Sequence, residues 1–282
     1  MCSDSSFWSN KNWTSGGVES KLNMLKPQFL DAQRKKSKRL SLTSPFLRRL
    51  ISSLVTDALF EFYGGTVSMR CLQSSIAVKR LLDIYGIKSK NFIGDVCLLE
   101  ASEDGNLCTW GGFWNDHYHV WTVTEHGERV DLTVAELHNH PASSRSCWAK
   151  LPSIWWDNIQ ESVAPLIYLE DAPVDPGIGI YELKEELAEF LELVDKKHFD
   201  ALKSKTADQI ISIDQVSKSS DLRQLEIDGH PWAKAAGRFL EIGLPPLPEW
   251  IISRQAAIKT AHMQGKPRPS IRANLRQFRR TG

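Results

Sequence analysis

The chain has 282 residues, enough for one large domain or two small ones, and 41% of them are hydrophobic, as in ordinary globular proteins. Its 35 Lys and Arg nearly balance its 34 Asp and Glu, which makes nucleic acid an improbable partner and argues against attraction to membrane surfaces. The five cysteines show no tight spacing and the chain has no signal-like start, which together predict free thiols in the cytoplasm. No apolar run reaches about 18 residues, so we expect no membrane span.

The N-terminal region, residues 1–43, is rich in Ser, Asn and Lys and has no clear periodicity. We expect it to be mostly irregular, with a short helix as an option from Lys21 to Gln33. We interpret its basic run, Arg34 to Arg39, as a solvated linker, and the alternative is a site for acidic lipid or nucleic acid. A helix is predicted over 44–63, because Ser44 suits the N-cap, the proline after it suits the first helical position, and apolar residues follow on one face.

The next segment, Gly64 to Gly86, reads GGTVSMRCLQSSIAVKRLLDIYG and predicts a helix that begins at Cys71. Gly86 stands where a glycine commonly ends a helix. A cysteine in the first turn of a helix faces unpaired backbone N–H groups and the positive end of the helix dipole, and both favour the thiolate. Cys71 is therefore a candidate nucleophile, and the alternative is that it is a small core residue.

The segment from Asp116 to Thr133 predicts a β-hairpin. His119 begins its first strand and Asp131 lies on its second, so that the two side chains can meet and the carboxylate can hold the imidazole by its Nδ1–H. With the turn at Glu125 to Glu128, we expect Asp131 to lie opposite Thr122.

Candidate binding groups accompany these residues. Either Gln73 or Ser68 is placed to support an oxyanion hole, although the backbone N–H of Cys71 is the more direct donor. Trp114 and Trp121 belong to a tryptophan-rich stretch, 110–156, which either lines a cleft or fills the core.

A second histidine, His117, shares a strand face with His119 and is the rival base. His-x-His also occurs in metal sites, and a site made of His117, His119 and His138 is the metal-binding alternative. We expect no metal and no cofactor.

The rest of the chain predicts more strands and then helices. Strands are predicted at 91–101 and 162–169, and the segment 108–114 is either a strand or a loop on the substrate side. The predicted helices are at 183–194, 231–242 and 248–264. The segment 137–176 is rich in proline and is expected to be a wall of the site or a packing loop. The final basic stretch, 266–280, either binds an acidic partner or is a disordered end.

Three motifs in this order resemble the transglutaminase-like superfamily of papain-like cysteine peptidases and acyltransferases: a cysteine that opens a helix, His-Val-Trp on a strand, and Val-Asp-Leu-Thr on the next strand. The cysteine segment is most similar to the bacterial branch that includes lasso-peptide leader peptidases. The resemblance covers about residues 60–135 and implies Cys71 as nucleophile, His119 as base and Asp131 as orienting carboxylate. Leu72 stands where true transglutaminases usually have Trp, which argues against protein cross-linking.

We therefore expect an α+β fold with a papain/transglutaminase-like core, in which the nucleophile helix packs on an antiparallel sheet. This catalytic core is assigned to residues 44–176, between the irregular segment 1–43 and a helical C-terminal region, 177–282, with a basic tail.

The expected activity is cysteine-dependent acyl transfer on an amide bond of a peptide or protein, as a peptidase, deamidase or transamidase. Two alternatives remain open. One is a catalytically inactive transglutaminase-like fold that binds a peptide or protein, and the other is a metal-dependent hydrolase. The oligomeric state is left open.

Overall fold

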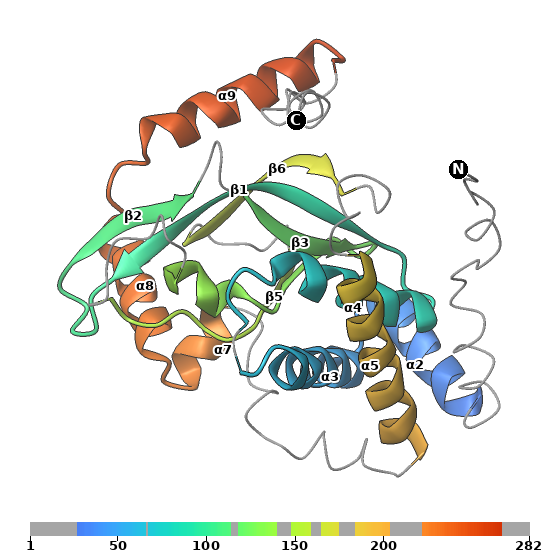
Figure 1. Cartoon of the computed structure of the whole chain (residues 1–282). Helices are drawn as coiled ribbons and strands as arrows, with labels where there is room; N and C mark the ends of the chain where they lie inside the picture. Colours follow the sequence, from blue (N-terminus) through green and yellow to red (C-terminus); the bar gives the residue numbers. More distant parts are fainter. Residues whose placement is uncertain are drawn as a thin grey trace, which may run out of the picture.

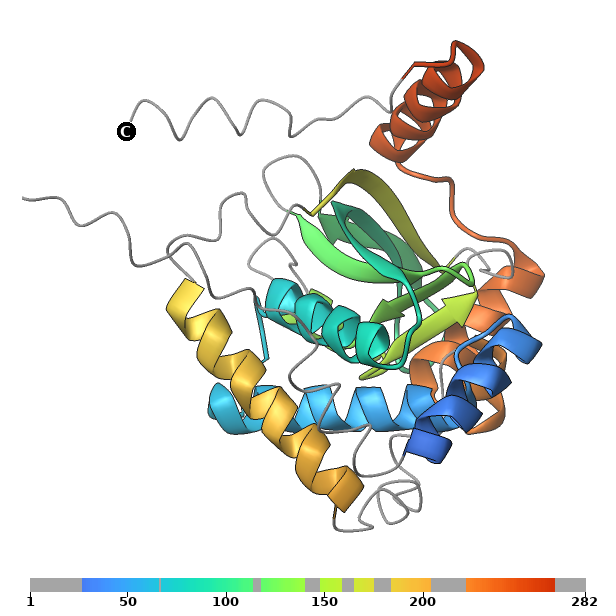
Figure 2. The same ribbon diagram turned by 90° about the vertical axis from the view of Figure 1, so that its right-hand side faces the viewer.

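The structure is a computed structural model that describes residues 27–65, 67–113, 118–139, 148–158, 165–174, 184–203 and 222–266. The fold is α+β, as expected: a curled antiparallel sheet carries α4 on one face, α3 and α5 lie behind α4, and α9 lies over the other face (Figures 1 and 2). The helices are α2 (Pro27–Leu40), α3 (Pro45–Phe62), α4 (Cys71–Ile84), α5 (Lys184–Lys203), α7 (Leu222–Ile227), α8 (Pro231–Ile242) and α9 (Glu249–Met263), with a 3-10 helix, η1 (Val134–Asn139).

The described strands form one six-stranded sheet in the order β2-β1-β3-β4-β5, with β6 also paired to β1. The long strand β1 pairs with β3 through its first half, with β2 through its second half and with β6 along its middle. The strands are β1 (Ser89–Ala101), β2 (Cys108–Phe113), β3 (His119–Thr124), β4 (Glu128–Asp131), β5 (Trp155–Asn158) and β6 (Leu166–Pro173).

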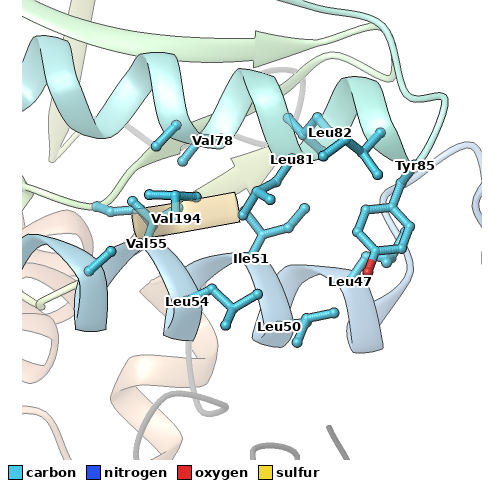
Figure 3. Packing of buried hydrophobic residues seen from close by; sticks show 14 of the residues in the cluster. Leu47, Leu50, Ile51, Leu54, Val55, Val78, Leu81, Leu82, Tyr85 and Val194 are labelled. Carbon is cyan, nitrogen blue, oxygen red and sulfur yellow. The ribbon is translucent and has the colours of Figure 1, made fainter. Parts of the chain in front are cut away.

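Helices α3 and α4 form the centre of the main hydrophobic core, and both begin where the sequence predicts. Ser44 caps α3 by accepting a hydrogen bond from Leu47 N, and α4 begins at Cys71. Their facing apolar side chains pack together with Val194 of α5 (Figure 3). The helix that carries Cys71 is therefore held between this core and the sheet.

The C-terminal helices complete the same hydrophobic clusters. Phe190 and Val194 of α5 are fully buried among side chains of α3 and α4, and Trp232 of α8 donates from Nε1 to Leu99 O of β1 at 2.8 Å. The predicted helix at 231–242 is confirmed as α8. Residues on both sides of the boundary expected between residues 176 and 177 thus pack in the same two hydrophobic clusters, one with α5 and the other with α8.

The basic run in the N-terminal region lies in a helix, α2, rather than in an irregular linker. Arg34 donates from Nε to Tyr85 O at 3.0 Å and from Nη2 to Ile84 O at 2.8 Å, so it satisfies carbonyls at the C-terminal end of α4. Gly86 has a φ of +69°, and a Cβ there would lie 2.9 Å from Arg34 Nε. Glycine is therefore required at this position both by the backbone and by the arginine.

The hairpin of β3 and β4 has a register one residue away from the expected one. Thr122 pairs with Val130, and continuing this register places Asp131 opposite Trp121 rather than opposite Thr122. The three-residue loop ends in Gly127 with a φ of +76°, which is typical of a hairpin with a glycine bulge. Because a shift of one residue turns a side chain to the other face, this register places Asp131 on the face of His119.

A buried carboxylate fixes this hairpin to α3. Glu128 is fully buried; its Oε2 accepts from Thr43 N at 2.9 Å and from Thr124 Oγ1 at 3.0 Å, and its Oε1 accepts from Arg48 Nη2 at 2.6 Å and from Trp156 Nε1 at 3.2 Å. All of these partners are donors, which is the environment that an ionised carboxylate requires.

Replacing Glu128 by glutamine is therefore expected to lower the free energy of unfolding by about 3–5 kcal/mol, because an amide leaves the Arg48 charge uncompensated and turns an N–H₂ group toward donors. Urea denaturation at neutral pH measures the change. Glu125→Gln is the matched control: Glu125 is exposed at the same turn, and its change should stay within about 0.5 kcal/mol. Equal effects of the two substitutions would contradict this role for Glu128.

Candidate functional site

Cys71 is the first residue of α4, and its place relative to the sheet is fixed by the next turn of that helix. Ser75 Oγ donates to Val120 O at 3.0 Å, and Thr122 Oγ1 donates to Ser75 O at 3.1 Å. Within the described chain, the N-cap residue Arg70 gives the helix no side-chain cap. Cys71 is half-buried and lies beside β3, the strand that begins with His119.

His119 joins the two other predicted catalytic residues. Its Nε2 lies 2.6 Å from Asp131 Oδ2, and its ring is also hydrogen-bonded to the side chain of Cys71. The sequence-based expectation that the carboxylate holds Nδ1 is wrong, since Nε2 makes that contact. Nδ1 is therefore the nitrogen left to face Cys71.

Asp131 is buried and accepts four hydrogen bonds. Its Oδ1 accepts from Thr133 N at 2.9 Å and from Thr133 Oγ1 at 3.0 Å, and its Oδ2 accepts from His119 Nε2 and from Tyr168 OH at 2.9 Å. Burial raises the pKa of Asp131, but the charge on His119 and these hydrogen bonds outweigh burial and hold the pKa below its ordinary value. The carboxylate is therefore ionised at neutral pH.

The same contacts determine the charge of His119. Burial lowers its pKa, but the Asp131 carboxylate and the Cys71 side chain more than offset this and raise the pKa to about 10. The imidazole is therefore protonated at neutral pH, and a cation beside a cysteine favours the thiolate. The site therefore combines a half-buried cysteine, a protonated imidazole and an ionised carboxylate.

The other described thiols lie in different surroundings. Burial, with the charge of Glu100, raises the pKa of Cys97 to about 12, and burial also raises the pKa of Cys108. Cys2 and Cys147 lie outside the described residues. Among the described cysteines, Cys71 is thus the one whose side chain contacts a histidine.

Gln73 is turned toward α5. Its Nε2 lies 3.5 Å from Glu186 Oε1, which also accepts from Tyr63 OH at 2.7 Å and from Arg70 Nη1 at 3.2 Å. Gln73 is buried, and its Oε1 has no hydrogen-bond partner among the described residues. The backbone N–H groups in the first turn of α4 are accordingly the better placed donors to an oxyanion at Cys71.

The remaining predicted binding residues divide into two groups. Trp121 is fully buried; its ring stacks on that of His119 with centroids 6.3 Å apart and makes an edge contact with Tyr168 at 5.0 Å. It therefore supports the histidine rather than offering a surface to a ligand. Trp114 and His117 lie outside the described residues.

A metal-ion alternative has no support in the described part of the chain, where no group of three or more His, Cys, Asp or Glu could hold an ion. His138 lies in η1, and His117, the other member of the proposed set, is not described.

Two further site residues were missed by sequence reasoning. Thr133 follows Asp131 by two residues, and this spacing is a local signal for a hydrogen bond from the backbone to the Asp side chain. Tyr168 gives no such signal, because it reaches Asp131 from 37 residues away through the pairing of β6 with β1.

Comparison of the chain with protein-family models, with curated proteins and with solved structures finds no match. In the described ranges, no helix combines the length and the apolar character that crossing a bilayer requires.

Proposed function

We propose that this chain is a cysteine-dependent acyltransferase or hydrolase with a transglutaminase-like catalytic core, in which Cys71, His119 and Asp131 act on an amide bond of a peptide or protein. The observation that carries the proposal is the series of hydrogen bonds from the Cys71 side chain through the His119 ring to the buried Asp131 carboxylate. The order of the three residues along the chain agrees with the motif resemblance.

The chemistry has two halves. The Cys71 thiolate attacks the carbonyl carbon to form a C–S bond, and the C–N bond breaks as the His119 imidazolium gives its proton to the leaving amine. Water or an amine then attacks the thioester and gives a proton to His119, and the thiolate leaves. Asp131 stays ionised throughout and holds the ring. N–H groups at the start of α4 stabilise the oxyanion.

The nature of the acceptor decides the class of enzyme. Water makes the protein a peptidase or, on a side-chain amide, a deamidase, and an amine makes it a transamidase. Both outcomes use the same first half-reaction, so formation of an acyl-enzyme on Cys71 tests the proposal without knowledge of the natural substrate.

The test is incubation of the full chain with a p-nitrophenyl acyl ester at neutral pH, followed by mass spectrometry of the intact protein and of its peptides. We expect one acyl group on Cys71, which is lost with time by hydrolysis and is lost faster when an amine is added as acceptor. Cys71→Ala should prevent the modification, and Cys108→Ala is the control that should preserve it. Faster acylation of Cys97 or Cys108, or a folded protein whose Cys71 is inert, would contradict the proposal, and inertness would favour the non-catalytic binding module.

A further inference from the structure

Tyr168 of β6 contacts the same carboxylate oxygen as the candidate base. Its hydroxyl donates to Asp131 Oδ2 at 2.9 Å, and His119 Nε2 lies 2.6 Å from that oxygen. Tyr168 is buried, and burial together with the charge of Asp131 raises the pKa of its phenol well above the ordinary value. The hydroxyl therefore keeps its proton and acts as a donor toward Asp131.

The ring of Tyr168 is held from two sides. Trp121 meets it edge to face, with centroids 5.0 Å apart, and the guanidinium carbon of Arg129 lies 4.4 Å from its centroid. Arg129 is itself buried, with Nη1 3.8 Å from Asp157 Oδ2, and neither its Nε nor its Nη1 has a hydrogen-bond partner among the described residues. The charge of Arg129 is thus directed at the aromatic face.

A cation over the face of a phenol withdraws charge from the ring and makes its O–H a stronger donor. Arg129 and Asp131 are alternate residues of β4, so their side chains leave the same face of the sheet, with Tyr168 in contact with both. The order of contacts runs from Arg129 through Tyr168 and Asp131 to His119. This arrangement goes beyond the need to fill a core, since a phenylalanine would fill the same volume.

We propose that Tyr168 is a positioning residue of the site: its hydroxyl fixes the Asp131 carboxylate and competes with His119 for Oδ2, and so sets the strength of the histidine–aspartate hydrogen bond. The catalytic part of this inference rests on the proposed function, whereas the hydrogen-bond competition does not.

The test is Tyr168→Phe, observed by proton NMR of protein with ¹⁵N-labelled histidine. The resonance of the His119 Nε2 proton, assigned by its absence from His119→Ala, should move downfield, because an oxygen relieved of one donor accepts more strongly from the other. The rate of Cys71 acylation by the p-nitrophenyl ester should fall by about tenfold, as expected for loss of a hydrogen bond to a charged group.

The matched control is Tyr85→Phe, which removes a buried tyrosine hydroxyl 2.7 Å from His198 Nε2 and should leave the His119 resonance in place. An unchanged His119 resonance in folded Tyr168→Phe protein would overturn the inference, even if Cys71 is acylated normally in the parent chain. A shifted resonance in a chain whose Cys71 is never acylated would retain the hydrogen-bond competition and reject the proposed function.

Discussion

His119→Ala is expected to lower acyl transfer by about 10²–10⁴-fold, the usual contribution of a positioned acid–base group. It should also slow alkylation of Cys71 by iodoacetamide at pH 7 by roughly 30-fold, because a cysteine without a cationic partner has a pKa of about 8.5 and is only a few per cent ionised there. The measurements are hydrolysis of the p-nitrophenyl ester and the rate of Cys71 carbamidomethylation by mass spectrometry.

This substitution also removes the cation beside a buried carboxylate, so the variant must be shown to be folded. His119→Gln is the second variant, since its amide can still donate to Asp131 Oδ2 but cannot transfer a proton. Its activity should be as low as that of His119→Ala with a smaller loss of stability.

Two other histidines provide the comparison. His198 is a buried histidine whose pKa is lowered to about 4 by burial, so it is neutral, and His198→Gln should leave the alkylation rate unchanged. His117→Ala tests the rival base two residues upstream. Loss of activity in His117→Ala with normal activity in His119→Ala would contradict the assignment of His119.

The elements that support the site could be predicted because their signals are local. Ser44 and the proline after it mark the start of α3, the glycine at residue 86 marks the end of α4, and the apolar periodicity between them is helical. The position of Cys71 at a helix start follows from these signals, and the position of His119 at a strand start follows from the hairpin pattern of residues 116–133. The local sequence pattern therefore predicted which elements carry the candidate cysteine and histidine.

The register of the hairpin could not be fixed in the same way. A two-residue turn and a three-residue loop both suit Glu125 to Glu128, and they differ by one residue in pairing. The structure uses the longer loop, with Gly127 at positive φ, and only this choice turns Asp131 to the side of His119. The choice between the two turns therefore also decided whether Asp131 lies on the same face of the sheet as His119.

Long-range partners were not predictable from pattern. Tyr168, Arg34 and Glu186 each act through a hydrogen bond to an element far away in the sequence. The helix α2 was anticipated only in part, as a short helix from Lys21 to Gln33, whereas the structure has a helix from Pro27 to Leu40. Charged side chains occupy most of its surface and few of its residues, such as Leu30, are buried. Its order depends on contacts with α4, which no local propensity reports.

Asp131→Asn is expected to reduce acyl transfer by on the order of 10³–10⁴-fold while the fold persists. Four donors face the carboxylate, and an amide cannot accept from both sides. If its oxygen faces Thr133 N, its N–H₂ group donates to His119 Nε2 and forces the neutral ring to carry its proton on Nδ1, toward Cys71. If the amide oxygen faces His119 instead, the amide N–H₂ group points at Thr133 N, which is also a donor. The measurement is the rate of acylation and of alkylation of Cys71.

The control for this isosteric change is Asp57→Asn, at an exposed carboxylate that pairs with Lys197 on the surface. It should leave both rates unchanged and alter stability by no more than about 1 kcal/mol. Normal alkylation of Cys71 in Asp131→Asn would contradict the orienting role of Asp131.

The same variant should change how stability depends on pH. The pKa of His119 is raised from the ordinary value of about 6.5 to about 10, so its contribution to stability is complete below pH 6.5 and is lost as the pH rises toward 10. The lowered pKa of Asp131 adds stability above pH 4 that is lost in stronger acid. In Asp131→Asn the attraction that raised the His119 pKa is gone and burial keeps the ring neutral.

Between pH 6.5 and pH 10, urea denaturation should therefore show that the free energy of unfolding falls by on the order of a few kcal/mol in the parent chain and by much less in the variant. Equal losses in both proteins would mean that the histidine and the aspartate are not coupled as the 2.6 Å contact indicates.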